Sequence, residues 1–127
     1  MINITNIFFV LCGGALGSVI RYIMQIFISS LGFSNGTALF IINSLGSALI
    51  GLAYAIYNIK SVEYAIISPL IITGFLGGFT TFSSYSWWIL NMGKVSPISA
   101  LIYILTNTTL AVILTFIGYK IGCILVK

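Results

Sequence analysis

Four long apolar segments fill almost the whole chain, and they constrain its fold more than any other feature. They cover about residues 4–31, 37–57, 64–90 and 98–126. A helix needs about 20 apolar residues to cross the hydrocarbon core of a bilayer, and each segment reaches that length. The 127 residues leave room for short connections but not for a further domain. We therefore predict an all-α protein of the cell membrane, with one four-helix transmembrane domain over residues 1–127 and lipid around it.

Charge is scarce in this chain, which limits the chemistry it can perform. Only 5% of the residues are charged and 60% are hydrophobic, a composition unlike that of a soluble domain. Glu63 is the only acidic residue and histidine is absent, which excludes paired carboxylates, Ser-His-Asp triads and histidine metal sites. We predict that the protein is not an enzyme. Its five basic residues are scattered and do not form the run that would indicate a nucleic-acid partner.

The third segment differs from the others because glycines, hydroxyl residues and aromatic residues meet near its centre. Gly74, Gly77 and Gly78 weaken a helix in mid-span, since glycine has the largest backbone entropy and no side chain to pack. Hydroxyl and aromatic residues alternate directly afterwards, in the stretch 79–86. We expect the third helix to be broken at Gly77 and Gly78. The backbone groups freed by such a break need protein or a water-filled cavity to receive them.

Two interpretations of this stretch remain open on its composition alone. Small and hydroxylated residues let transmembrane helices approach closely and form hydrogen bonds to one another, so the stretch would serve helix packing. Alternatively it is a permeation site, in which backbone carbonyls hold a cation while hydroxyls and the positive edges of aromatic rings face an anion.

Polar residues in the other spans also permit two interpretations each. Arg21 either extends to the membrane interface or provides charge in a water-filled vestibule. Asn43 either bonds a neighbouring helix, which is the default expectation, or lines a path. Tyr103 and Asn107 lie one helical turn apart, and Thr108 follows Asn107 directly. These residues form either a polar seam along a pore or hydrogen bonds to a neighbouring helix.

Turn residues place the connections between the spans. Glycines and asparagines mark them at residues 32–36, 58–63 and 91–97. With four spans, three basic residues fall on the side of both termini and two on the other side: Lys60, Lys120 and Lys127 against Arg21 and Lys94. The positive-inside rule therefore hardly selects an orientation. A chain that inserts both ways can pair with an inverted copy of itself.

The motifs in the first three spans, taken together, identify a family. They are Gly13-Gly14, Gly17 and Arg21-Tyr22, then Asn43-x-x-Gly46, and finally the run Gly74, Gly77, Gly78, Thr80, Thr81, Phe82 and Ser83. This combination resembles the Fluc (CrcB) family of small fluoride channels. The resemblance implies an antiparallel, dual-topology homodimer with two fluoride pathways and a structural Na⁺ at its centre, which would export fluoride passively.

The resemblance also implies roles for individual residues. The sodium ligands would be the backbone carbonyls of Gly77 and Thr80 from both subunits. The anion pathway would be lined by the following residues: Asn43 through its amide, Phe82 and Tyr85 through their ring edges, Ser83 and Ser84 through their hydroxyls, and Arg21 in the vestibule. The family has phenylalanine where this chain has Tyr85, so the sequence leaves open whether the added hydroxyl donates to the anion or narrows the path.

Fluoride is a chemically reasonable cargo for such a set of side chains. A small, strongly hydrated anion needs donors that replace its water, and amide, hydroxyl and ring-edge hydrogens offer these without a fixed charge that would trap the ion. The alternative is a small dual-topology multidrug exporter. Proton-coupled export of cations needs an intramembrane carboxylate, whereas Glu63 falls in a predicted connection.

Overall fold

The computed structural model of the chain describes residues 3–59 and 66–126, and within these ranges every regular element is a helix. The elements are α1 (Ile4–Ser30), α2 (Asn35–Ile59), η1 (Ile67–Leu76), α3 (Gly77–Phe79), α4 (Phe82–Val95) and α5 (Pro97–Leu125). η1 has π-helical hydrogen bonding, whereas the others are α-helices. The predicted all-α fold class is confirmed.

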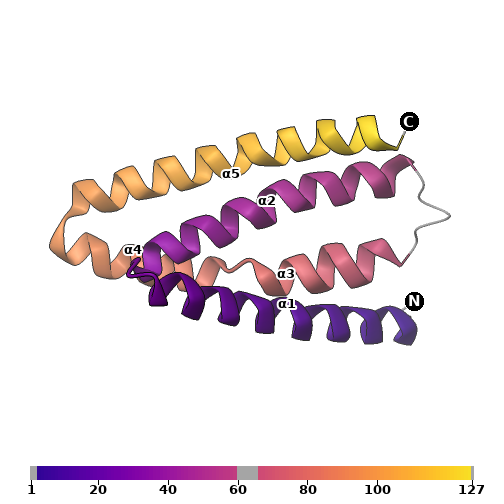
Figure 1. The fold of residues 1–127 in the computed structure, drawn as a ribbon, viewed down its shortest axis with the longest axis horizontal. Coiled ribbons are helices and arrows are strands. Elements are labelled where there is room, and N and C mark those ends of the chain that lie inside the picture. The colour runs from indigo at the N-terminus through magenta and orange to yellow at the C-terminus, as the bar shows by residue number, and fades with distance from the viewer. Residues whose placement is uncertain (1–2, 60–65, 127) are drawn as a thin grey trace.

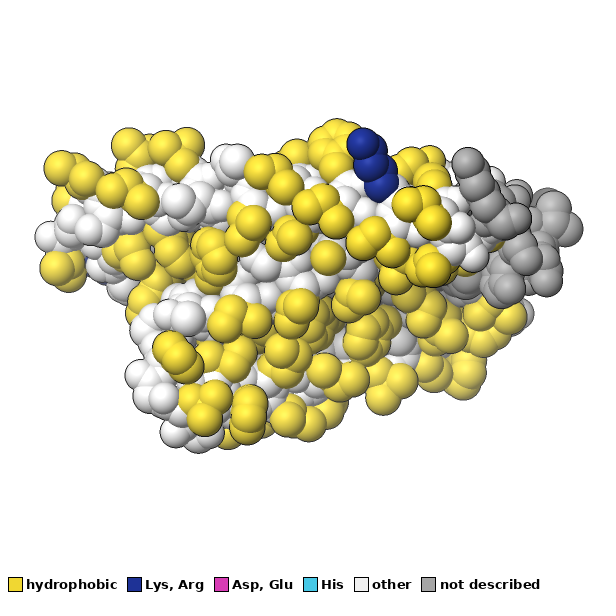
Figure 2. Space-filling model, turned by 45° about the horizontal axis from the view of Figure 1, so that its top comes forward, with side chains coloured by type: hydrophobic (Ala, Val, Ile, Leu, Met, Phe, Trp, Pro, Cys, Tyr) yellow, Lys and Arg dark blue, Asp and Glu magenta, His cyan; other side chains and the backbone are white. Residues whose placement is uncertain are grey.

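The helices form a bundle in which the third crossing is broken. α1, α2 and α5 are each long and apolar enough to cross a membrane. η1, α3 and α4 follow one another in the same general direction and complete the remaining crossing (Figure 1). The two ends of the described chain lie at the same end of the bundle (Figure 1), as an even number of crossings requires. Hydrophobic side chains cover much of the face seen in Figure 2, which suits contact with lipid.

The break lies at Thr80 and Thr81, so the prediction that it would lie at Gly77 and Gly78 is wrong. Gly77 is helical, with φ −64° and ψ −35°. Thr80 (φ −81°, ψ 155°) and Thr81 (φ −147°, ψ 115°) are extended. The backbone N–H of Thr81, which would continue the helix by donating to the Gly77 carbonyl, donates instead to Asn43 Oδ1 at 3.1 Å. The competing side chain on α2, and not glycine flexibility, ends the first half-helix.

The glycines of this region instead allow α1 to pack closely against η1 and α3. A Cβ atom on Gly13 or Gly17 would collide with backbone atoms of residues 70–79, and one on Gly78 would lie 2.5 Å from the Gly14 carbonyl oxygen. Glycine at these positions therefore lets two backbones touch, as in the small-residue packing of transmembrane helices. The same kind of contact joins α2 to α5 through Gly51 and Gly118.

The connections agree only in part with the predictions. The first is a turn over residues 31–34 in which Gly32 has φ +86°, a conformation that favours glycine. The predicted connection with Lys60 and Glu63 lies outside the described residues. The predicted turn over residues 91–97 is wrong, because α4 continues to Val95 and Ser96 alone separates it from α5. Ser96 can do this because its N–H donates to the Met92 carbonyl while its Oγ accepts from the N–H of Ser99.

Candidate functional site

Asn43 and Thr81 join α2 to the helix break. Asn43 Oδ1 accepts from the Thr81 N–H at 3.1 Å, and Asn43 Nδ2 donates to the Thr81 carbonyl at 3.4 Å. The interhelical role expected by default is therefore present. An amide group carries two N–H donors, so this pairing leaves one of them for another acceptor. Thr81 was not among the predicted site residues, although threonine is one of the residues preferred at a helix N-cap.

The break exposes the N-terminus of α4 in the middle of the crossing. Thr81 caps this helix, because its Oγ1 accepts from the N–H of Ser84 at 3.3 Å. The same Oγ1 donates to Ser84 Oγ at 3.2 Å and shares a hydrogen bond with Ser83 Oγ at 3.3 Å. The predicted residues Ser83 and Ser84 thus lie together around the positive end of a helix dipole, where anions are stabilised.

An open hollow of about 340 Å³ lies beside the break, and three of the six predicted pathway residues line it: Asn43, Phe82 and Tyr85. Its lining includes Asn43, Thr80, Thr81, Phe82, Tyr85, Asn107 and Thr108. α2, α4 and α5 all contribute to it. The sequence did not determine which polar residues of the last span lie here, and the structure brings Asn107 and Thr108 to the hollow. None of the lining residues carries a charge.

Three aromatic rings run from this hollow toward α5. The ring centroids of Phe82 and Tyr85 are 5.6 Å apart with an interplanar angle of 40°, and those of Tyr85 and Tyr103 are also 5.6 Å apart, at 28°. Phe82 is 78% exposed, whereas Tyr85 is only 6% exposed. The Tyr103 hydroxyl donates to the Gly36 carbonyl at 2.8 Å, but the Tyr85 hydroxyl has no hydrogen-bond partner within residues 3–59 and 66–126.

Arg21 lies at the C-terminal end of the first half-helix. Its Nε donates to the Gly78 carbonyl at 3.1 Å, and Ser18 Oγ donates to the same oxygen at 3.5 Å. A cation is favourable here because the carbonyl end of a helix carries partial negative charge. Arg21 is half-buried, and this contact is compatible with both sequence interpretations. Its place on an anion pathway stays a prediction.

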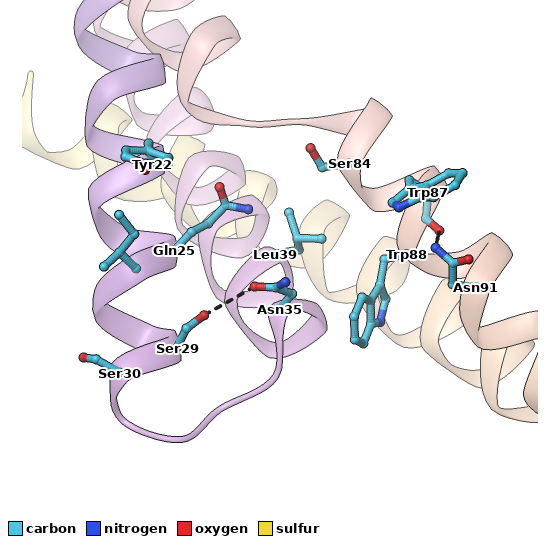
Figure 3. A pocket seen from close by; sticks show the side chains of 11 residues that line it. Tyr22, Gln25, Ser29, Ser30, Asn35, Leu39, Ser84, Trp87, Trp88 and Asn91 are labelled. Carbon is cyan, nitrogen blue, oxygen red and sulfur yellow. Dashed lines mark hydrogen bonds between the residues drawn. The ribbon is translucent and has the colours of Figure 1, made fainter.

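A larger hollow of about 770 Å³ opens between α1, α2 and α4. Figure 3 shows Gln25 of α1 pointing toward α4, with Ser84 at the start of α4 and Trp87 farther along that helix. Ser29 Oγ donates to Asn35 Oδ1 at 3.3 Å across its base (Figure 3). The hollow is neutral, and apart from Ile26 and Leu39 its lining side chains are polar or aromatic, so it suits a water-accessible approach to the break.

The predicted cation ligands lie next to this break. Gly77 is exposed and Thr80 is half-buried. The Thr80 hydroxyl and N–H both donate to the Leu76 carbonyl, at 2.9 and 3.0 Å. Because the Thr81 N–H donates to Asn43, it does not donate to the Gly77 carbonyl. The described chain has no cluster of three acidic, histidine or cysteine side chains. Backbone carbonyl oxygens are hard ligands that suit an ion such as Na⁺.

Comparison with known proteins places the chain in a family. Residues 8–119 match the family described as CrcB-like protein, Camphor Resistance (CrcB). A fluoride-specific ion channel FluC from Shewanella denitrificans is 35% identical over 121 residues, covering 92% of this chain and 95% of the relative. A fluoride-specific ion channel FluC 1 from Staphylococcus haemolyticus is 36% identical over 119 residues, covering 91% of this chain and 98% of the relative.

These matches span nearly the whole chain and agree with its helical architecture. The relatives carry the names of ion channels, in agreement with the prediction that the chain is not an enzyme. The apolar helices and the family together establish a multi-pass membrane protein. The resemblance inferred from the glycine, threonine and asparagine motifs is confirmed, and this chain belongs to the CrcB-like protein family.

Proposed function

We propose that this protein is a passive, fluoride-specific channel that lets fluoride leave the cell across the cell membrane. The observation that carries the proposal is the broken third crossing, where a helix N-terminus, an amide and hydroxyl groups surround an uncharged hollow in mid-membrane. Relatives that are 35% and 36% identical are named fluoride-specific ion channels. Neutral donors of this kind replace the hydration shell of a small anion, and they bind the anion weakly enough for it to leave.

The proposed path begins in the large hollow and continues past the start of α4. Ser84 lines the large hollow, and Phe82 and Tyr85 line the smaller one beside the break. The ion would pass the hydroxyls of Ser83 and Ser84, then the ring edges, and meet the free N–H of Asn43. Ring edges are partly positive and therefore attract an anion. Arg21 would add a positive potential near the entrance.

The proposed assembly is an antiparallel homodimer with two such paths and one central Na⁺. Its support is the exposure of Phe82 and Gly77 in the single subunit. Exposed aromatic and small residues beside a helix break are what a second copy would cover. The carbonyls of Gly77 and Thr80 from each copy would hold the ion. Bound Na⁺ would satisfy backbone groups that have left the helix and offset the partial negative charge there.

Efflux from liposomes tests this function directly. We expect liposomes that contain the purified protein to release fluoride and to retain chloride. Phe82→Ile keeps apolar bulk but removes the ring edge, and because Phe82 is 78% exposed the subunit should still fold. Fluoride efflux should fall in this variant and persist in the control Phe116→Ile, which changes an exposed ring on α5 away from the hollow.

Two results would contradict the proposal. Release of chloride as fast as fluoride by the unmodified protein would exclude a fluoride-specific channel. Equal fluoride efflux from the unmodified protein and Phe82→Ile, with assembly intact, would show that the aromatic residues serve packing and not permeation.

A further inference from the structure

We infer that Arg21 is a positioning residue for the proposed cation site. Its side chain caps the carbonyl of Gly78 and so holds the neighbouring Gly77 carbonyl, a proposed ligand, in the direction that a cation requires. Arg21 lines neither the 340 Å³ hollow nor the 770 Å³ hollow, so this role is separate from the proposed anion path. The inference rests on the proposed Na⁺ site and names a residue that controls it.

The helix break removes the helical donors of two neighbouring carbonyls. In a continuous helix the Gly78 carbonyl would accept from the N–H of Phe82. Because Thr80 and Thr81 are extended, Phe82 begins the new helix α4 and does not make this bond. The Gly77 carbonyl has lost its helical donor in the same way. Carbonyl groups left at a helix end need a substitute partner.

Two side chains of α1 donate to the Gly78 carbonyl in place of the lost backbone N–H. Arg21 Nε lies 3.1 Å from this oxygen and Ser18 Oγ lies 3.5 Å from it, so Arg21 makes the shorter bond. Gly14, Ser18 and Arg21 follow one face of α1 at positions i, i+4 and i+7. Gly14 lets the backbones touch, since its carbonyl oxygen would be 2.5 Å from a Cβ on Gly78. The two donors come farther along the same face, where the opposite half-helix ends.

The guanidinium of Arg21 has no acidic partner in the part of the chain that the structure describes. Glu63 is the only acidic residue of the sequence, and it lies outside residues 3–59 and 66–126. Arg21 is half-buried, and a buried charge needs a compensating polar group. The carbonyl end of a helix, with its partial negative charge, provides one. Helix end and arginine therefore stabilise each other.

This cap restrains the turn that carries the proposed ligand. Helix ends fray when their carbonyls lack partners, and Gly77 and Gly78 have no side chains that could restrain the turn by packing. Ligands must be held within about 0.5 Å of the productive geometry. A donor on the Gly78 carbonyl keeps the adjacent Gly77 carbonyl ordered before the ion arrives, which lowers the cost of binding.

The test measures, at fixed protein concentration, the Na⁺ concentration at which half of the purified protein can be crosslinked as a dimer. Arg21→Gln keeps an N–H donor at the position of Nε and removes the charge, whereas Arg21→Met has a similar length and neither property. The half-maximal Na⁺ concentration should stay the same or fall in Arg21→Gln, since a like charge near the ion is removed. It should rise about fivefold in Arg21→Met, as expected for the loss of one hydrogen bond.

Ile28→Ala is the matched control for general destabilisation of α1, because Ile28 is 6% exposed and lies two turns beyond Arg21 on the same helix. This variant should lower the melting temperature and leave the half-maximal Na⁺ concentration unchanged. Should Arg21→Met form no dimer at any Na⁺ concentration, normal dimerisation of Arg21→Gln would still show that the donor is required. Failure of both variants to dimerise would overturn the inference.

The outcomes separate this inference from the proposed cation site. Unmodified protein that stays monomeric, or that dimerises equally without Na⁺, would overturn both. A Na⁺-dependent dimer with the same half-maximal concentration in the unmodified protein and in Arg21→Met would overturn only the positioning role. Equal weakening by Arg21→Gln and Arg21→Met would also overturn it, because the charge and not the donor would then matter. An equal rise in Ile28→Ala would do the same, since the effect would come from stability alone.

Discussion

Replacing Gly78 by alanine should separate the two helices that hold the break in place. Gly78 lies where α3 crosses α1, and an added Cβ would lie 2.5 Å from the Gly14 carbonyl oxygen and 3.1 Å from the Gly14 carbonyl carbon and Cα. Ordinary contact begins at 3.4 Å, so the backbones must move apart by about 0.9 Å. No side-chain rotation can relieve this overlap, because every nearby atom belongs to the backbone.

The expected cost follows from two opposing effects. Overpacking a tight contact costs up to about 3 kcal/mol, and the rigid backbones favour the upper end of that range. Alanine is better than glycine in a helix by up to about 1 kcal/mol, which offsets part of it. We therefore expect Gly78→Ala to lower the free energy of unfolding by about 2 kcal/mol, which lowers the folded-to-unfolded ratio roughly 30-fold.

Denaturation in detergent micelles measures this change, with the fluorescence of Trp87 and Trp88 reporting on α4. The matched control is Gly14→Ala at the same helix crossing, where the nearest atom to the added Cβ is the Gly74 carbonyl oxygen at 3.9 Å. That variant should keep the stability of the unmodified protein or raise it by up to about 1 kcal/mol, because only the helix-propensity gain of alanine remains. Equal destabilisation by both substitutions, or none by Gly78→Ala, would refute the idea that backbone contact at Gly78 sets the helix separation.

The remaining predictions concern assembly and orientation. Gly77→Leu should leave the subunit folded, since a Cβ there comes no nearer than 4.0 Å to the Ile72 carbonyl oxygen. The same substitution should abolish the dimer and Na⁺ retention. Crosslinking that still yields dimers would contradict this prediction. Thr80→Ser keeps the backbone carbonyl and a hydroxyl for the Leu76 carbonyl, so Na⁺ retention and fluoride flux should change little, and loss of either would show that the side-chain methyl matters. Two lysines added within residues 31–36 should bias insertion to one orientation. C-terminal tags on the unmodified chain should be labelled equally from both sides of the membrane. A single orientation of the unmodified chain would rule out dual topology.

Much of the architecture could be predicted from the sequence because membrane insertion depends on local properties. The length and hydrophobicity of each segment determine whether it spans a bilayer, so the four crossings and their approximate limits follow directly. Gly13 and Gly17 predict close helix contact in the same way, because only the absence of a side chain lets backbones meet. The family followed from the spacing of residues within three spans.

The position of the break could not be predicted from local sequence. Glycine flexibility pointed to Gly77 and Gly78, yet Gly77 remains helical and the helix ends at Thr80 and Thr81. The deciding partner is Asn43, which lies 38 residues away in sequence and takes the Thr81 N–H. A helix ends where another acceptor competes successfully for its backbone donors, and only the tertiary structure determines which acceptor is within reach.

The same physical reason separates residues that look alike in the sequence. Tyr85 and Tyr103 are both tyrosines in apolar spans, but the fold gives the Tyr103 hydroxyl a carbonyl partner on α2, whereas the Tyr85 hydroxyl has no partner among residues 3–59 and 66–126. Arg21 likewise meets the Gly78 carbonyl, 57 residues farther along the chain. Sequence determines which donors a chain carries into the membrane, whereas packing decides which of them remain free, because hydrogen bonds act only over contact distances.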